Sequence, residues 1–379
     1  MNGIQTLTGN SYAVIDLKKL KRNIEKVKGL MGETVKFLPV LKGSTCGHGL
    51  EEIAEFLVRE CGLDMLCVGH VIEAERLRSH GITCDILVFG GSPFNNIPYV
   101  VEHGITTTLA GEEYARELSK AARGAGTQAK VHIKINTGLN RLGVEPGDEL
   151  EALLREVKAL PGLLVEGAYT HFATATERDT QFVRHQAALF EQALAQLKEA
   201  GFSLKYRHVA NSVATIRFPE YHYDMVRNLV SMLGYDASPD GTAPLGLEEI
   251  LCWKAFISQI RDVKAGERFG YYRAHLASHD MRIAISSFGY ADGYPDDAAS
   301  NGGYVIIRGK KAPILSLDMD QGYIDVTEIE DAAVNDEMLL LGGGGEQKIT
   351  IMDIMEHTHV GGLYILSMIG QRVRRIYTK

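Results

Sequence analysis

The chain has 379 residues, a formal net charge of −8 and 45% hydrophobic residues. This composition is typical of a globular protein with a large buried core, and it excludes a disordered or fibrous chain. No basic stretch with interleaved aromatic residues and no apolar run of membrane-spanning length occurs, so neither a nucleic acid nor a membrane is expected as a partner.

The polar first segment lacks the apolar core of a signal peptide. The five cysteines form no C-x-x-C pair and show no zinc-ligand spacing with histidine. We therefore expect a cytoplasmic protein with reduced thiols and no metal site.

The first part of the chain alternates between short β-branched runs and amphipathic helical stretches, beginning with Asp16 as the expected N-cap of a first helix. The predicted strands span residues 35–42, 65–68, 85–89, 106–109, 130–136, 163–170, 206–210 and 225–230. The helices predicted between them span residues 51–60, 72–79, 111–123, 150–159 and 181–200. Eight such βα units predict a (β/α)8 TIM barrel, an α/β fold, over residues 12–236.

After Asp236 the pattern changes to short strands broken by Gly, Asp and Pro. It predicts a C-terminal, mostly β domain over residues 237–379, with residues 1–11 packing on it. The expected strands are CWKAFISQI, DMRIAISSFGY, GYVIIRG, APILSLD, YIDVTEI and EMLLLGGGG. The four glycines at 342–345 lack the GKS/T ending of a phosphate loop, so a β turn is expected there.

Functional side chains of a TIM barrel lie where the strands end. Lys42 follows the first strand in PVLKGSTCGHG, and a partly desolvated lysine can form an imine with an aldehyde. Ser212 begins a helix after strand seven, and the amides of Leu229 and Val230 follow strand eight, where barrels usually bind phosphate. A lysine opposite a phosphate site favours pyridoxal 5'-phosphate (PLP). Taken singly, Lys42 could be a solvated lysine and Ser212 a helix cap.

The chain resembles the alanine racemase family over nearly its whole length. The motifs that carry the resemblance are KGSTCGHG, KINTGLNRLGV, THFATATERD, HVANSVAT, MVRNLVSMLG, GERFGYYRAHLA, FGYADGYP, MDQ and RVRRIY. The resemblance implies a PLP-dependent amino-acid racemase that is a homodimer with shared active sites. It implies that Lys42 holds PLP as a Schiff base and is one catalytic base, and that Tyr271 of the partner subunit is the other. By composition alone, Tyr271 would be an aromatic residue packed in a β domain.

The resemblance also assigns binding roles. Arg227 would face the pyridine nitrogen, and His171 would help Tyr271 to lose its proton. The cofactor-binding residues that it implies are Lys42, His171, Asn211, Ser212, Arg227, Leu229 and Val230.

The implied substrate-binding residues are Arg141, Met319, Asp320 and Tyr290, the last three from the partner subunit. Arg141 would sit near the substrate carboxylate, with a surface salt bridge as the alternative, and Asp320 could be a turn residue. Lys134 aligns with a lysine that is carbamylated in some relatives.

Several positions depart from the family pattern. Cys46 and Gln371 stand where tyrosines linked to the phosphate are usual, and Leu229 replaces a usual glycine. Acidic or less basic residues occur near the expected entrance, namely Asp296, Ser316 and Asp318. They leave open a racemase for a cationic or polar amino acid such as lysine, ornithine or serine, or a decarboxylase-like enzyme. A PLP-carrying regulatory protein is disfavoured because such proteins lack the β domain.

Overall fold

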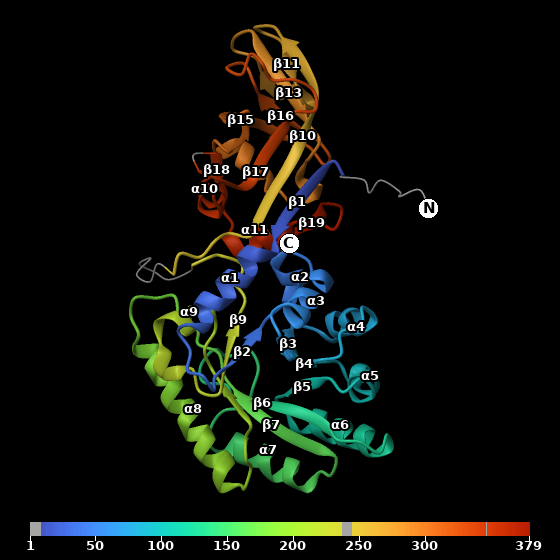
Figure 1. The fold of residues 1–379 in the computed structure, drawn as a ribbon, viewed down its shortest axis with the longest axis vertical. Helices are drawn as coiled ribbons and strands as arrows, with labels where there is room; N and C mark the ends of the chain where they lie inside the picture. The colour runs from blue at the N-terminus through green and yellow to red at the C-terminus, as the bar shows by residue number, and fades with distance from the viewer. Residues whose placement is uncertain (1–8, 237–244, 346) are drawn as a thin grey trace. The chain divides into compact units, whose positions relative to one another are not determined.

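The structure is a computed structural model that describes residues 9–236, 245–345 and 347–379 (Figure 1). It contains two compact units. One comprises residues 19–45 and 50–248, and the other comprises the chain up to residue 18, residues 46–49 and residues 249–379. The predicted domain boundary after residue 236 adjoins residues 237–244, and the segment 1–11 that was predicted to pack on the β domain includes residues 1–8. Residues 237–244 and 1–8 lie outside the described residues.

The first unit is built around eight parallel strands. They are β2 (Lys36–Pro39), β3 (Met65–Val68), β4 (Asp85–Val88), β5 (Thr106–Leu109), β6 (Ala129–Lys134), β7 (Leu163–Tyr169), β8 (Tyr206–His208) and β9 (Met225–Asn228). Strands β3 to β8 pair in sequence order, and β2 pairs with β9. Two contacts close the ring: a bridge from Val40 to Cys67, and a hydrogen bond of 3.0 Å from Arg227 N to Ala210 O. The predicted TIM barrel is confirmed.

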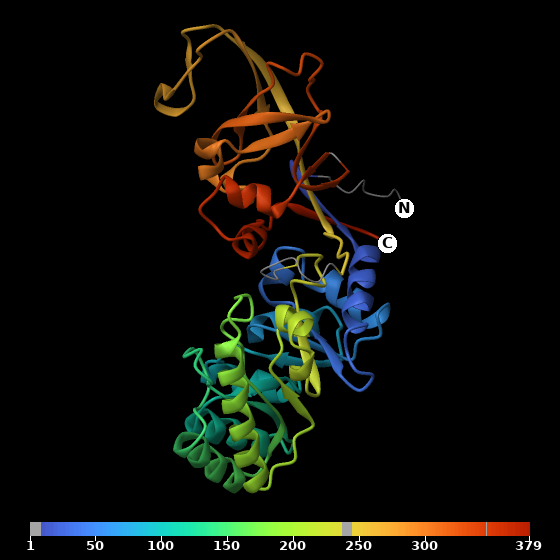
Figure 2. The ribbon, with the colours of Figure 1, turned by 90° about the vertical axis from the view of Figure 1, so that its left-hand side faces the viewer.

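Helices lie outside these strands (Figures 1 and 2). They are α1 (Leu17–Lys28), α2 (Lys42–Cys46), α3 (Glu51–Arg59), α4 (Val71–Ser79), α5 (Ile97–Glu102), α6 (Glu112–Gly124), α7 (Asp148–Ala159), α8 (Gln181–Glu199) and α9 (Ser212–Arg217), with 3₁₀ turns η1 (Phe94–Asn96) and η2 (Pro219–Tyr221). Their apolar residues recur at helical spacing, as in α6, where Ala115, Leu118 and Ala122 are buried. Helices on the outside and packed side chains inside bury the strands on both faces, so β3 and β9 are buried throughout.

The second unit is a mostly antiparallel β structure. Its strands are β1 (Ser11–Asp16), β10 (Leu251–Val263), β13 (Met281–Ser286), β14 (Tyr304–Ile307), β15 (Lys310–Leu317), β16 (Gly322–Asp325), β17 (Glu337–Gly344), β18 (Gln347–Ile349) and β19 (Arg374–Thr378), with a separate hairpin of β11 (Arg268–Phe269) and β12 (His275–Leu276). Strand β10 pairs with both β13 and β17, which closes a six-stranded barrel through β14, β15 and β16. The predicted mostly β C-terminal region is confirmed.

Two details differ from the sequence prediction. The barrel was expected to begin at residue 12, whereas Ser11–Asp16 forms a strand that pairs with β10 and β19. The glycines at 342–344 belong to β17 and pair with β18 rather than forming only a turn. Glycine is required at Gly342, because its φ is 84° and a Cβ atom would lie 2.3 Å from Leu251 O.

Short helices complete this unit: α10 (Ile351–Glu356), α11 (Gly362–Met368), and the 3₁₀ turns η3 (Tyr271–Arg273), η4 (Tyr290–Asp292) and η5 (Asp296–Asn301). Helix α10 begins at a capping box, in which Thr350 accepts from Asp353 N and the Asp353 carboxylate accepts from Thr350 N. Across the described ranges of the chain, no helix combines the length and the apolar character needed to cross a membrane.

Candidate active site

Lys42 lies just beyond the end of β2, where the chain turns with an unusual hand. Residues Gly43, Ser44 and Thr45 have φ between 50° and 64° and ψ between 41° and 47°, and Cys46 has φ 48°. A left-handed turn costs roughly 1–2 kcal/mol for each residue other than glycine. Contacts around the turn must therefore hold it, and one of them is the hydrogen bond of 2.8 Å from Thr45 N to Leu41 O. The Lys42 side chain is exposed.

Arg227, on β9, is anchored inside the barrel and is only 3% exposed. Its Nη1 group donates to His208 Nδ1 and to His208 O, at 3.1 and 2.9 Å. Its Nη2 group donates to Thr170 O, Val209 O and His171 Nδ1, at 2.9, 2.9 and 3.2 Å. Burial lowers the pKa of Arg227 to about 10, so it remains a fixed cation at neutral pH.

His171 follows β7 and receives its hydrogen bond from Arg227 at Nδ1. Because guanidinium can only donate, the proton of a neutral His171 must reside on Nε2. Burial lowers the pKa of His171 well below its usual range, and the cations Arg227, Arg141 and Lys42 lower it further. His171 is thus a neutral imidazole whose Nε2–H is available to an acceptor such as a phenol oxygen.

Two further histidines, His208 and His132, extend this network behind Arg227. Arg227 donates to His208 Nδ1, so His208 Nε2 carries the proton and donates to His132 Nδ1 at 2.9 Å. Burial lowers the pKa of His132 to about 3 and that of His208 well below its usual range. His208 also stacks on Tyr169, with ring centroids 4.8 Å apart. These neutral rings fix the arginine without adding a second positive charge.

Lys134 ends β6 inside the same end of the barrel and is 4% exposed. Its Nζ donates to Ile135 O at 2.7 Å and lies 5.3 Å from the Tyr169 ring centroid. Burial, and then the nearby cations Arg227 and Arg141, lower the pKa of Lys134 to about 7. The Lys134 amine therefore loses its proton far more easily than an ordinary lysine does.

This pKa predicts a pH dependence of stability. A lysine in the unfolded chain titrates near 10.4, so between about pH 7 and pH 10 the unfolded state binds more protons than the folded state. The free energy of unfolding should therefore rise with pH in this window, by at most about 1.4 kcal/mol per pH unit. Urea unfolding of the cofactor-free protein in carbon-dioxide-free buffers should show this rise, and Lys134→Met should flatten it. Identical slopes for the two proteins would contradict the assignment.

Ser212 connects the segment that follows β8 to the segment that follows β9. Its Oγ accepts hydrogen bonds from Leu229 N and Val230 N, at 2.9 and 3.1 Å. Asn211, not Ser212, is the N-cap of α9, because its side chain accepts from Ala214 N. A hydroxyl and two amides gathered at one point are suitable groups for binding a phosphate. Leu229 is accommodated without a left-handed backbone, so the usual glycine is not needed here.

Arg141 is exposed and belongs to the first unit, whereas Tyr271, Tyr290, Met319 and Asp320 belong to the second. Tyr271 lies in η3, between β11 and β12, and its side chain is 72% exposed. The neighbouring Tyr272 is fully exposed. Burial raises the pKa of Tyr323, and Asp318 and Tyr271 raise it further, which places these two residues near Tyr323.

The predicted entrance residues Tyr290 and Met319 are held side by side. Tyr290 N donates to Asp318 O, and Ala291 N donates to Met319 O, both at 3.0 Å. The approach is close at Gly289, where a Cβ atom would lie 2.2 Å from Asp318 O. The sequence motifs FGYADG and MDQ thus form one surface.

Arg372 holds the two motifs of this surface together. It forms a bidentate ion pair with the buried Asp292, at 2.8 and 3.0 Å, and a second ion pair with Asp320. It also donates to Met319 O at 3.2 Å. Asp320 is therefore not a free acidic group, because Arg372 pairs with its carboxylate.

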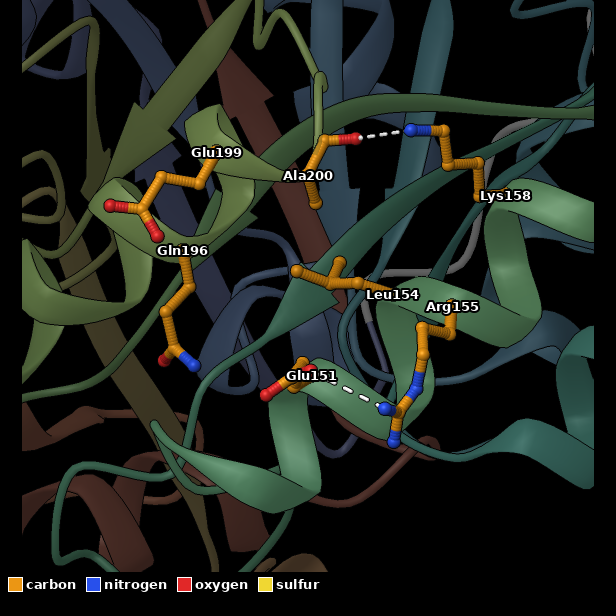
Figure 3. Close-up of a pocket in the computed structure, with 7 residues that line it drawn as sticks. All are labelled: Glu151, Leu154, Arg155, Lys158, Gln196, Glu199 and Ala200. Carbon is orange, nitrogen blue, oxygen red and sulfur yellow. Dashed lines mark hydrogen bonds and ion pairs between the residues drawn. The ribbon is translucent and has the colours of Figure 1, made fainter.

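A pocket elsewhere in the first unit lies between α7 and α8 (Figure 3). Its volume is about 310 Å³, and it is lined by Glu151, Leu154, Arg155, Lys158, Gln196, Glu199 and Ala200. Several of its polar groups are already paired: Arg155 pairs with Glu151 at 3.3 Å, Lys158 donates to Ala200 O at 3.1 Å, and Gln196 bonds to Gly147. This pocket contains none of the predicted site residues, and we do not assign the chemistry to it.

Sequence reasoning missed some residues of the site. His208 lies at the start of the HVANSVAT motif, and its position on a strand end was a usable signal. His132 gave no signal, because its partner His208 lies 76 residues away along the chain. Of the positions that depart from the family pattern, Cys46 is buried and Gln371 is exposed.

Comparison with known proteins gives one consistent result. Residues 15–236 match the alanine racemase N-terminal domain family, and residues 250–377 match the alanine racemase C-terminal domain family. The chain is 36% identical over 372 residues to the alanine racemase of Halothermothrix orenii, covering 98% of this chain and 97% of that protein. It is 35% identical over 364 residues to alanine racemase 2 of Caldanaerobacter subterraneus, covering 96% and 93%.

Solved structures give the same result. The alanine racemase of Clostridium difficile superposes with a TM-score of 0.93 at 30% identity, covering 98% of this chain and 97% of that one. The alanine racemase of Bacillus anthracis with bound L-Ala-P gives a TM-score of 0.93 at 30% identity, covering 99% and 96%.

Proposed function

This chain belongs to the alanine racemase family, and we propose that it interconverts L- and D-alanine with pyridoxal 5'-phosphate as its cofactor. The observation that carries the proposal is the anchored, permanently charged Arg227 at the same end of the barrel as Lys42 and Ser212. The cofactor, when bound, supplies an electron-withdrawing ring that acidifies the Cα–H bond of the amino acid.

The residues at this end of the barrel are suited to binding pyridoxal 5'-phosphate. Ser212 O–H would donate to the phosphate, and the amides of Leu229 and Val230, which donate to Ser212 Oγ here, would donate to phosphate oxygens instead; Asn211 would shape the helix start beside it. Arg227 would face the ring nitrogen, where its fixed charge keeps that nitrogen unprotonated. Lys42 would supply the amine that holds the aldehyde carbon.

Two bases explain how a racemase inverts Cα. Lys42 would exchange a proton on one face of the substrate, and Tyr271 of the partner subunit would exchange a proton on the other. His171 supports the second role, because its Nε2–H can donate to a phenol oxygen and so stabilise the ionised form. Arg141 would bind the substrate carboxylate; it lies near the Lys134 amine, whose pKa it lowers.

The exposure of Tyr271 supports a homodimer. Two adjacent exposed tyrosines are a feature of surfaces that bind a partner. We expect light scattering to give twice the chain mass for the active species. An active species with the mass of a single chain would contradict the shared site.

Lys134 is proposed as a carbamylation site. Its unprotonated amine can attack the carbon of carbon dioxide, forming a nitrogen–carbon bond and releasing one proton. The product is an anion placed near Arg141. Carbon-13 bicarbonate should give a carbamate signal with the wild-type protein and none with Lys134→Met; equal spectra would refute the modification.

Alanine is the proposed substrate because the relatives that match this chain are alanine racemases. Among the acidic residues near the expected entrance, Asp320 is paired with Arg372, which offsets its charge. Met319, Tyr290 and Asp320 would line the entrance of the partner's site.

The proposed reaction can be tested directly. The purified protein, loaded with pyridoxal phosphate and given L-alanine, should accumulate D-alanine until the two enantiomers are equal. Lysine, ornithine and serine should be converted more slowly, and carbon dioxide release should be absent. Failure to invert any of these amino acids would reject the proposed function.

A further inference from the structure

Glu73 connects two loops beside Lys42 through a buried carboxylate. It lies in the first turn of α4, is 9% exposed, and was not predicted to have any role. Its Oε1 accepts from Gly43 N at 2.6 Å. Its Oε2 accepts from Gly69 N at 2.8 Å and from His70 N at 3.1 Å.

These three bonds join segments that are distant in sequence. Gly43 directly follows Lys42 after β2, whereas Gly69 and His70 connect β3 to α4. The two segments leave no space between them, because a Cβ atom on Gly69 would lie 3.2 Å from Lys42 Cβ and 3.3 Å from Glu73 Oε2. Hydrogen bonds from amides to an ionised carboxylate are stronger than those between neutral groups. Glu73 therefore ties the backbone of Lys42 to a rigid strand end.

The tie acts at the first residue of the left-handed turn. Gly43 has φ 64° and starts the run of unfavourable backbone angles that continues through Ser44 and Thr45. Such a run persists only where surrounding contacts determine it. If the Gly43 amide lost its acceptor, the turn would relax and the Lys42 side chain would start from a different backbone direction.

We propose that Glu73 is a positioning residue for Lys42: its carboxylate holds the Lys42–Gly43 peptide against the loop after β3 and so aims the Lys42 amine. Glu73 acts through the backbone and does not touch the substrate. Its effect on catalysis rests on the proposed function, whereas its effect on the backbone does not.

Glu73→Gln tests this with minimal change of shape. The amide has one oxygen, which cannot serve both sides of the original contact. It should turn toward the two donors Gly69 N and His70 N, leaving its NH₂ group against the Gly43 N–H. Glu73→Asp keeps the charge but is shorter by one methylene, so it should cap α4 and lose Gly43 as well. Glu75→Gln is the matched control, because Glu75 is exposed on the same helix.

Hydrogen–deuterium exchange of the cofactor-free protein gives the first reading. In Glu73→Gln, residues 41–45 should exchange about tenfold faster, while residues 67–72 should remain protected. Glu75→Gln should match the wild type in both segments. A merely structural role would instead raise exchange in both segments together.

Kinetics of the loaded protein give the second reading. A displaced amine should lower kcat about tenfold to a hundredfold in both Glu73 variants, with KM changed less than about threefold. If residues 41–45 in Glu73→Gln exchange like the wild type, the proposal is wrong. If they exchange faster but kcat is unchanged, the tie exists and does not position the amine, which also overturns it. If the wild type itself inverts no amino acid, the proposed function fails, and the exchange data still decide whether the tie exists.

Discussion

Lys42→Ala should lose racemase activity by at least about a thousandfold, because the substitution removes both the amine that holds the cofactor and one of the two bases. The initial rate of D-alanine formation from L-alanine measures this. The protein should still fold, since the Lys42 side chain is exposed and Ala can follow β2 equally well. Its circular dichroism should therefore match that of the wild type.

The matched control is Lys120→Ala, an exposed lysine on α6. Its activity should equal that of the wild type. A Lys42→Ala protein that is folded, loaded with cofactor and retains a tenth of the wild-type rate would show that another group performs the chemistry.

Tyr271→Phe should lower racemisation about a hundredfold to ten-thousandfold, because phenylalanine keeps the ring and removes the acid–base group. Tyr272→Phe is a stringent control: the neighbouring tyrosine is more exposed, belongs to the same 3₁₀ turn and should tolerate the change. In deuterated water, the Tyr271→Phe protein should still exchange the Cα hydrogen of one enantiomer, through Lys42, and not of the other. Equal loss of exchange for both enantiomers would argue against two separate bases.

A mixing experiment then tests whether the site is shared. Equal amounts of Lys42→Ala and Tyr271→Phe subunits, unfolded together and refolded, should give mixed dimers in about half of the population. Each mixed dimer contains one site with both substitutions and one with neither, so about a quarter of the wild-type activity should return. No recovery would place Lys42 and Tyr271 of the same chain in one site.

The barrel could be predicted from the sequence because its signals are local. The strands are short runs rich in β-branched or apolar residues, and the structure places β3 and β5 at the predicted positions. Helix α5 was missed because it has only six residues and contains Pro98. Strand β1 gave no signal of its partners, since β10 and β19 lie more than two hundred residues away.

The candidate site was predictable only in part. A sequence pattern can reveal residues that lie at strand ends or within recognisable motifs, such as Lys42, Ser212 and Arg227. The hydrogen bonds that give them their properties are not visible in a pattern: the position of the Arg227 guanidinium is fixed by His208, and the backbone after Lys42 is held by Glu73. Such roles depend on three-dimensional contacts between residues that are unremarkable in the sequence.

Covalent attachment of pyridoxal phosphate to the Lys42 amine can be measured by borohydride reduction of the loaded protein, followed by digestion and mass spectrometry. We expect a pyridoxyl group on the peptide that contains Lys42, and none on the peptides that contain Lys134 or Lys120. An unmodified Lys42 peptide from fully loaded protein, or the label on another lysine, would show that Lys42 does not hold the cofactor.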